Sequence, residues 1–289
     1  MTFKEAVATV QRFAAATSSV DSFDDLPKKL PRMEYFLSLL GNPHKQYKTI
    51  HVGGTSGKGS TAAMIASILQ ASGYRVGLHT QPYLERFTEK ISINGEPIDD
   101  ALFVELVQTL MQTVEKLKKS EYGLGAGFYF QLSTALAFQA FADASVDYGV
   151  IEVGVGGEFD STNVIVPEVS VLTNVSLDHT QFLGDTVEKI AATKAGIIKP
   201  GIPVVSAATQ RSVRSILRKK AASMRAPLFF YGKDFSDPQC PVRMLGRHQR
   251  VNASCAVMAV KLLKHQIDEA AIKKGLASAF LPGRFEIVR

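Results

Sequence analysis

Two hydrophobic patterns alternate along the chain. Short runs of apolar and β-branched residues are separated by longer segments in which apolar residues recur every three or four positions. The short runs predict strands and the longer segments predict helices, and such alternation is typical of a parallel sheet covered by helices. The predicted strands are residues 49–53, 75–80, 148–153, 169–173, 203–206 and 228–231. The predicted helices are residues 59–72, 99–119, 130–142, 187–197, 212–224, 248–265 and 269–280.

One segment breaks this alternation. In residues 91–98, Asn94-Gly95 stands between alternating isoleucines, which is a strong signal for a tight hairpin turn. The glycine-rich residues 122–127 are predicted to form a flexible loop. We therefore expect an α/β fold with a mostly parallel sheet flanked by helices and a small antiparallel excursion.

Composition limits the class of protein. With 289 residues, 46% of them hydrophobic, the chain is long enough to bury the core of a globular enzyme. No apolar run approaches the roughly 20 residues that a membrane-spanning helix needs, and the first residues do not form a signal-peptide core, so we expect a cytoplasmic protein. Cys240 and Cys255 form no CxxC pair and have no histidine cluster nearby, which indicates neither a disulfide framework nor a zinc site.

The net charge of +6 is compatible with a polyanionic ligand such as a nucleotide, a polyglutamate tail or nucleic acid. The densest basic stretch, residues 211–220, is better explained as the solvated face of an amphipathic helix than as a nucleic-acid patch. The chain has no tryptophan, and its basic residues are not interleaved with aromatic ones that would stack on bases. We therefore expect no nucleic acid as a partner. We also expect no membrane partner and a monomeric protein.

A glycine-rich segment follows the first predicted strand of the sheet and opens a helix. Residues 51–61 read His-Val-Gly-Gly-Thr-Ser-Gly-Lys-Gly-Ser-Thr. In such a turn the glycine amides, the helix dipole and Lys58 can face one anion, which makes a cradle for phosphate. The segment departs from the strict Walker pattern, because Val52 takes the place of the leading glycine and Gly59 follows the lysine. The alternative is a glycine-rich turn that carries a surface lysine.

This cradle predicts a P-loop-type fold that binds the phosphates of a nucleotide. Ser60 or Thr61 is the natural hydroxyl ligand for a magnesium ion on the nucleotide. The predicted nucleotide-binding residues of the segment are Gly54, Thr55, Ser56, Gly57, Lys58, Gly59, Ser60 and Thr61.

Several further motifs occur in one order. Residues 152–163 contain the pattern EVGxGGxxDxTN, and residues 82–98 contain P-x-L, F-x-E-[RK]-I and INGxxI. Together with Gly-Thr-Ser-Gly-Lys-Gly-Ser in the phosphate segment, these motifs resemble folylpolyglutamate synthases and dihydrofolate synthases, a family within the Mur ligase superfamily. Residues 30–43, 172–185 and 190–201 match other motifs of the family, so the resemblance runs from about residue 30 to the end.

The resemblance implies an ATP-dependent amide ligase of folate biosynthesis and one-carbon metabolism, which joins L-glutamate to dihydropteroate or to folylpolyglutamate. ATP would convert the acceptor carboxylate to an acyl phosphate, which the amine of glutamate then attacks. The aromatic residues 128–130 are expected to form a wall for the pterin ring. Competing hypotheses are a peptidoglycan-type Mur ligase and a truncated, catalytically weak nucleotide-binding module.

The resemblance also implies a domain division. Residues 1–285 are expected to form the ATP-binding central domain, with leading helices in residues 1–47. Residues 286–289 are expected to begin a linker to a carboxy-terminal glutamate ligase domain, whose Asp-Gly-Ala-His-Asn-Pro motif is absent from this sequence. We expect that domain to be missing or separately supplied.

Acidic and basic side chains at predicted strand ends are the candidates for metal binding and catalysis. Glu152 closes the apolar run Tyr-Gly-Val-Ile and is the best candidate magnesium ligand, or else it caps a neighbouring helix. The resemblance implies that His179 binds a second magnesium ion, while Asp178 either orients it or caps a turn. It also implies that Lys194 reacts with carbon dioxide, because a carbamate can ligate magnesium whereas an ammonium cannot. Lys58, Lys194 and His179 are the expected catalytic residues.

The remaining site residues depend on the resemblance. Asn252 and Arg284 match positions that contact ATP in the family. The chain departs from the family pattern at Gln81, where a magnesium-binding serine is common, at Gln131, where glutamate is common, and at Glu158, where arginine is common. An amide oxygen can still ligate magnesium. The expected magnesium ligands are Ser60, Gln81, Glu152, His179 and Lys194.

Overall fold

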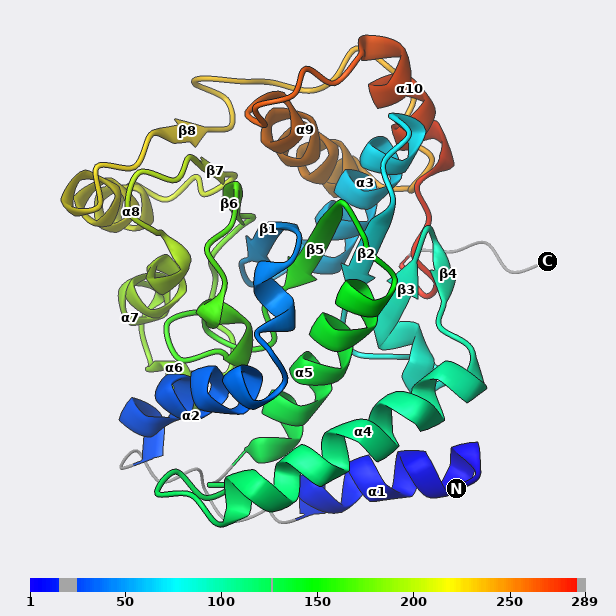
Figure 1. Cartoon of the computed structure of the whole chain (residues 1–289). Coiled ribbons are helices and arrows are strands. Elements are labelled where there is room, and N and C mark those ends of the chain that lie inside the picture. Colours follow the sequence, from blue (N-terminus) through cyan, green and yellow to red (C-terminus); the bar gives the residue numbers. More distant parts are fainter. Residues whose placement is uncertain (16–24, 126, 285–289) are drawn as a thin grey trace.

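The computed structural model describes residues 1–15, 25–125 and 127–284. Its centre is an eight-stranded sheet with the order β4-β3-β2-β5-β1-β6-β7-β8 (Figure 1), which confirms the predicted fold class. The parallel strands are β1 (Lys48–Gly53), β2 (Val76–His79), β5 (Tyr148–Glu152), β6 (Val169–Leu172), β7 (Val204–Ser206) and β8 (Leu228–Phe230). The antiparallel strands β3 (Ile91–Ile93) and β4 (Glu96–Pro97) form the predicted hairpin at one edge.

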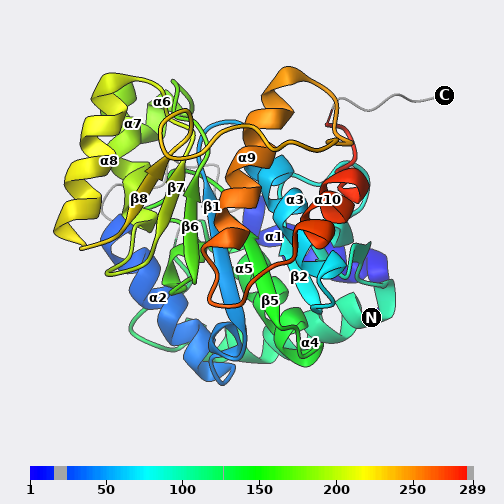
Figure 2. The same ribbon diagram turned by 90° about the horizontal axis from the view of Figure 1, so that it is seen from above.

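Helices cover both faces of the sheet (Figure 2). One face carries α3 (Lys58–Ala71), α9 (Arg247–Lys261) and α10 (Glu269–Ser278). On the other face, one buried cluster joins Ile151 of β5 to α5 (Phe128–Asp143), α4 (Asp100–Lys118), α2 (Leu26–Leu39) and α1 (Phe3–Ala15), and α1 packs on α4 and α5. Over β6, β7 and β8 that face carries α7 (Val187–Lys194), preceded by the short α6 (Thr180–Leu183), and α8 (Arg211–Ser223).

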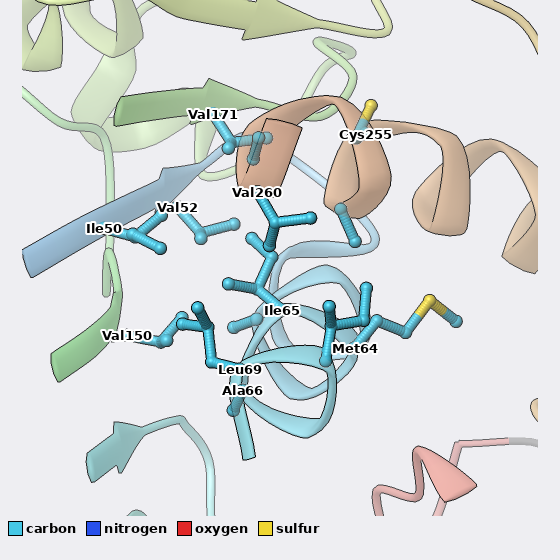
Figure 3. Close-up of a cluster of buried hydrophobic side chains, with 14 of the residues drawn as sticks. Ile50, Val52, Met64, Ile65, Ala66, Leu69, Val150, Val171, Cys255 and Val260 are labelled. Atoms are coloured by element: carbon cyan, nitrogen blue, oxygen red, sulfur yellow. The ribbon is translucent and has the colours of Figure 1, made fainter. Parts of the chain in front are cut away.

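The alternation of side chains in β1 decides which layer each residue joins. Ile50 and Val52 pack with Ile65 of α3 and Val260 of α9 in one buried cluster (Figure 3). His51 lies between Ile50 and Val52 in the strand and therefore points to the opposite face of the sheet. A strand buried on both faces reads as a nearly continuous apolar run, which is why the sequence predicts this element well.

Element ends differ from the prediction where local backbone geometry decides them. The helix predicted to start at residue 130 begins at Phe128, because Gly127 (φ +73°) supplies a left-handed residue before it. The helix predicted over 187–197 becomes a 3-10 turn after Lys194. The helix predicted over 248–265 is α9, which ends at Lys261. The leading helices expected in residues 1–47 are α1 and α2. Residue 126 and the expected linker at 286–289 lie outside the described residues.

The structure also bears on the expectations drawn from composition. Both cysteines are free thiols, and Cys255 is buried in the core. In the described residues no helix has the length and hydropathy to cross a membrane.

Two fully buried histidines occupy the middle of the sheet, because His51 of β1 and His79 of β2 both align with Ile151 of β5 between them. His51 Nε2 is hydrogen bonded to Thr162 Oγ1 (2.8 Å), and His79 Nδ1 donates to the Lys90 carbonyl (2.9 Å). The other nitrogen of each ring has no hydrogen-bond partner among the described residues. Burial lowers the pKa of His51 to about 3 and that of His79 to about 4, so both rings are neutral in the folded protein.

Replacing His79 with phenylalanine is expected to make the stability less sensitive to acid. The pKa of His79 is lower in the folded protein than in the unfolded chain, so the unfolded chain binds the proton first as the pH falls. The stability that depends on a neutral His79 is therefore fully present above about pH 6.5 and is lost as the pH falls towards 4. Urea unfolding at about pH 7 and about pH 5 should show that the wild type loses about 2 kcal/mol more than His79→Phe. A variant of the exposed His248 is the control, and it should lose as much stability between the two pH values as the wild type does. Equal losses in wild type and His79→Phe would contradict the assignment.

Candidate functional site

The loop of residues 54–57 joins β1 to α3 at the carboxyl edge of the sheet, where ligands bind in open parallel sheets. Gly54 (φ +133°) and Gly57 (φ +84°) both have a backbone that favours glycine. A Cβ atom on Gly54 would lie 1.9 Å from Oγ1 of Thr173, and one on Gly57 would lie 2.4 Å from Oδ1 of Asn252. Neither position accepts a larger residue, and Asn252 lies directly against the loop.

The end of β6 holds the loop in place through two residues that the sequence did not single out. The amides of Thr55 and Ser56 donate to the backbone carbonyl and the side-chain Oδ1 of Asn174, each at 2.8 Å. The Thr173 hydroxyl donates to the Ser56 carbonyl at 2.8 Å. These contacts join segments more than 100 residues apart. The only signal in the sequence is that residues 172–185 form a polar motif after a strand.

Two lysines donate hydrogen bonds to backbone carbonyls of the loop. Lys58, the first residue of α3, donates from Nζ to the Thr55 carbonyl (3.2 Å), and Lys194 donates from Nζ to the Gly54 carbonyl (2.8 Å). Lys194 is 2% exposed. Its burial, together with the positive charge of Lys58, lowers the Lys194 pKa to about 8. A site with two ammonium groups around glycine carbonyls and amides is strongly attractive to a polyanion.

Glu152 brings a buried negative charge to the same place. It is the last residue of β5 and is 2% exposed, and its Oε2 accepts the Gln81 amide (3.1 Å). A Cβ atom on Gly59 would lie 3.2 Å from this oxygen, so glycine lets the carboxylate approach the first turn of α3. Burial raises the Glu152 pKa to about 7, although Lys58, the Gln81 amide and Arg284 oppose the shift. A carboxylate that is this poorly solvated is well suited to a cation.

The two candidate hydroxyls have different environments. Ser60 Oγ accepts a hydrogen bond from Gln249 Nε2 (3.2 Å), and Gln249 Oε1 in turn accepts from Asn252 Nδ2 (2.9 Å). Thr61 Oγ1 is buried and has no hydrogen-bond partner among the described residues. Gln249 therefore positions both a predicted metal ligand and a predicted nucleotide ligand, and nothing in its local sequence indicates this.

His179 lies at the rim of the site. It has a left-handed backbone (φ +45°), its side chain is exposed, and its Nε2 is 3.7 Å from Asp178 Oδ1. The structure thus brings Glu152 and the two lysines to the loop but leaves His179 outside this buried group. Among the described residues no three side chains of His, Cys, Asp or Glu come together as a metal cluster. That result concerns only sites built from those four residue types.

The three departures from the family pattern have distinct surroundings. Gln81 contributes its backbone amide to Glu152. Gln131 is fully buried and donates from Nε2 to the Lys29 carbonyl (2.6 Å), so it ties α5 to α2. Glu158 is exposed, and its amide donates to the Thr193 carbonyl (2.9 Å) beside Lys194.

The signature loop after β5 is built on Asp160, another residue that sequence reasoning did not assign. Its Oδ1 accepts the amide and the hydroxyl of Thr162 at 2.9 and 2.5 Å, and its Oδ2 accepts the Val155 amide at 3.1 Å. The Thr162 hydroxyl also meets His51, so Asp160 links the loop to the buried centre of the sheet. Its position inside the EVGxGGxxDxTN pattern was the available signal.

The predicted aromatic wall holds only in part. Phe128 is 2% exposed and packs against Phe13 and Phe36 in the core, so its assignment to the wall was wrong. Tyr129 is half-buried, and Phe130 is 39% exposed. These two residues remain available at the start of α5.

A groove of about 600 Å³ is lined by Gln81, by Arg284 and by residues of α3 from Ala63 onwards. It runs between α3, the β3–β4 hairpin and the segment that carries Arg284. Leu281 lies close to the start of α3, since its side chain would be 3.1 Å from a Cβ atom on Gly59. Arg284 is near enough to Glu152 for its charge to lower that pKa, so the segment after α10 lies beside the site.

Comparisons with known proteins identify the family of the chain. Residues 52–236 match the family model of the Mur ligase middle domain. The dihydrofolate synthase/folylpolyglutamate synthase of Bacillus subtilis is 40% identical over 286 residues, which cover 90% of this chain and 66% of that protein. The folylpolyglutamate synthase of Lacticaseibacillus casei is 37% identical over 311 residues, covering 99% of this chain and 71% of that protein. The chain belongs to the folylpolyglutamate synthase and dihydrofolate synthase family of Mur ligases.

Solved structures of this family have the same fold. A Mycobacterium tuberculosis folylpolyglutamate synthase complexed with ADP gives a TM-score of 0.89 at 30% identity, covering 98% of this chain and 68% of that one. A complex described as FPGS-AMPPCP-folate gives a TM-score of 0.89 at 36% identity, covering all of this chain and 74% of that one. The present folylpolyglutamate synthase-type chain spans 66% and 71% of the two relatives named above.

Gly54→Ala is expected to disrupt nucleotide binding beyond any general loss of stability. The added methyl group would overlap Thr173 Oγ1 at 1.9 Å, so the loop or the end of β6 must move. Gly73→Ala is the matched control, because Gly73 also has a positive φ (+88°) but no heavy atom within 4 Å of the added Cβ. Both variants should lose about 1 kcal/mol from backbone strain. Calorimetric titration with an ATP analogue should show weakened binding for Gly54→Ala alone; equal affinity in both variants would contradict the role of the contact.

Proposed function

We propose that this chain is the ATP-binding part of a ligase that joins L-glutamate to dihydropteroate or folylpolyglutamate through an acyl phosphate. The observation that supports this most is that the buried side chains of Lys194 and Glu152 meet Lys58 at the glycine-rich loop. ATP as the nucleotide is supported by the AMPPCP complex of a relative, and a folate acceptor by the folate in the same complex. A cytoplasmic location and a monomeric state are part of the proposal.

The residues around the loop fit magnesium. Mg²⁺ prefers hard oxygen donors, and Glu152, the Gln81 amide oxygen and the Ser60 or Thr61 hydroxyl offer them. The unpartnered, buried Thr61 oxygen and the poorly solvated Glu152 carboxylate both gain from a cation. Bound magnesium would neutralise charge on the transferred phosphoryl group. His179 with Asp178 is proposed for a second ion at the rim.

The chain's own groups would orient the nucleotide. The amides of the loop, fixed by Asn174, and the ammonium of Lys58 would bind the phosphates, and this arrangement exists before any ligand arrives. Asn252 and Arg284 would contact the nucleotide outside the phosphates. Tyr129 and Phe130 would face the acceptor.

A second domain would complete the reaction. We propose that residues 1–285 act as the central domain and that ligation requires a carboxy-terminal domain. The two relatives named above are longer than the region that matches this chain, which is compatible with such a domain. Closure of two domains over a nucleotide excludes water and aligns the reacting groups.

Lys194 is proposed to become a carbamate. The neutral amine of Lys194 adds to the carbon of carbon dioxide, which forms an N–C bond, and one proton leaves the nitrogen. A Lys194 pKa of about 8 leaves part of the amine neutral at physiological pH. The carbamate would replace repulsion between Lys194 and Lys58 by attraction, and its N–H can still donate to the Gly54 carbonyl.

Lys58→Ala is expected to weaken ATP binding by about ten- to a hundredfold, because charge-assisted hydrogen bonds to phosphate contribute about 1.5–3 kcal/mol. Lys189→Ala removes an exposed lysine of α7 and should bind like the wild type. Amide formation should be measured by mass spectrometry with dihydropteroate, with folylpolyglutamate and with a UDP-muramyl substrate, in the presence and absence of a relative's carboxy-terminal domain. Turnover of only the UDP-muramyl substrate, or equal affinity in Lys58→Ala, would contradict the proposal.

Carbon-13 NMR with labelled bicarbonate should reveal the Lys194 carbamate. A carbamate signal is expected in the wild type and should be lost in Lys194→Ala. Lys199→Ala is the matched control, since the Lys199 pKa is also lowered by burial but its Nζ donates to the Asn163 carbonyl away from the loop. An identical signal in wild type and Lys194→Ala would show that the carbamate forms elsewhere.

A further inference from the structure

Asn163 lies in a short 3-10 turn after the loop that follows β5, and the proposed mechanism does not use its side chain. The turn spans Ser161–Val164, and Asn163 is 5% exposed. Its Nδ2 donates to the Glu158 carbonyl (3.0 Å) and to the Gly196 carbonyl (3.2 Å). One buried amide therefore joins two segments, which are the loop after β5 and the 3-10 turn Ala195–Ile197 that follows α7.

These two hydrogen bonds fix the orientation of the amide. Both partners are carbonyl oxygens, so only the NH2 group of Asn163 can face them. The Oδ1 atom on the other side of the amide is buried and has no hydrogen-bond partner among the described residues. An unpaired buried oxygen lowers the stability of a fold, and the two hydrogen bonds on the donor side are what Asn163 contributes in return.

The two joined segments touch each other through their backbones. The Glu158 amide donates to the Thr193 carbonyl (2.9 Å). A Cβ atom on Gly157 would lie 3.0 Å from the carbonyl oxygen of Lys194, and one on Gly196 would lie 2.4 Å from the Cα atom of Glu158. Because only glycine hydrogens separate the two backbones there, a movement of the loop after β5 would move the backbone of Lys194.

The side chain of Lys194 leaves this contact and enters the nucleotide site. Lys194 is the last residue of α7, and its Nζ donates to the Gly54 carbonyl of the glycine-rich loop (2.8 Å). A lysine amine is carried on a flexible four-carbon stem, so contacts at the backbone and along the stem decide where the amine lies. The hydrogen bond to Gly54 therefore depends on how firmly the end of α7 is held.

We infer that Asn163 is a positioning residue for Lys194, because its amide locks the loop after β5 to the turn after α7 and so holds the lysine at the Gly54 carbonyl. The consequence for catalysis rests on the proposed function, in which Lys194 becomes a carbamate. The placement of the amine does not rest on it and can be tested separately.

Lysine labelling with acetic anhydride, read by mass spectrometry in buffer freed of carbon dioxide, tests this placement. The reagent acetylates accessible neutral amines and releases acetate. In the wild type Lys194 and Lys90 should both be protected, since they are 2% and 4% exposed and burial lowers both pKa values to about 8. Asn163→Leu keeps a similar side-chain volume but cannot donate. In this variant Lys194 should be labelled about tenfold faster, the effect of losing two hydrogen bonds, while Lys90 stays protected.

Two control variants remove neighbouring hydrogen bonds and leave the Asn163 amide intact. Thr134→Val removes the bond between Thr134 and Ser161 of the same turn (2.9 Å). Lys199→Ala removes the donor to the backbone carbonyl of Asn163 (2.7 Å). Lys194 should stay protected in both. Asn163→Asp is isosteric but replaces the donors with an oxygen, so it should expose Lys194 as Asn163→Leu does.

Several labelling results would overturn the inference. They are rapid labelling of Lys194 in the wild type, unchanged protection of Lys194 in both Asn163 variants, and faster labelling of Lys194 in Thr134→Val. Equal labelling of Lys194 and Lys90 in both Asn163 variants would also overturn it, because the asparagine would then stabilise the whole fold and not the lysine.

Carbon-13 NMR with labelled bicarbonate separates the inference from the proposed function. The carbamate signal expected in the wild type should be lost in Asn163→Leu and Asn163→Asp, and a signal of full intensity in both variants would overturn the inference. If the wild type gives no carbamate signal, the proposed carbamate is wrong, and the labelling rates of Lys194 and Lys90 still decide the role of Asn163.

Discussion

The site depends on how closely three side chains approach the glycine backbone where β1 ends and α3 begins. Gly54 leaves room for Thr173, Gly57 for Asn252 and Gly59 for the Glu152 carboxylate. Each glycine faces a residue from a different element, so the loop is shaped by its neighbours as much as by its own conformation. The close approach also removes water, and the ionisable groups around the loop are poorly solvated as a result.

Poor solvation is what makes these groups chemically useful. Burial destabilises the charged forms of Glu152 and Lys194 and so shifts their pKa values towards neutrality from opposite sides. Coulombic interactions in such a region are stronger than in water. Folding has already removed water from these charged groups, so a phosphate chain that binds there would not have to displace that water. Burying these charged groups lowers the stability of the fold, and the apolar clusters on both faces of the sheet offset that loss.

The sequence predicts what is encoded locally. Strands such as β1 and β5 are short apolar runs, the hairpin turn is Asn94-Gly95, and the glycine-rich loop between β1 and α3 is contiguous, so all three elements could be located. Thr173, Asn174 and Gln249 could not be assigned, because their roles arise only when distant segments meet. Phe128 was misplaced for the same reason, since an aromatic residue at a helix start can face either the core or a ligand. His179 was placed by resemblance, and its exposure is visible only in three dimensions.

The strand order has a consequence for synthesis of the protein. Lys48 at the start of β1 pairs with Tyr148 of β5, a hundred residues later, and Ile50 pairs with Val169 of β6. A nascent chain therefore displays β1, with both of its hydrogen-bonding edges open, until Tyr148 and the rest of β5 have left the ribosome. Such long-range pairing slows folding and exposes an apolar edge to other chains. The strand order that forms the loop between β1 and α3 therefore delays the closure of the sheet during synthesis.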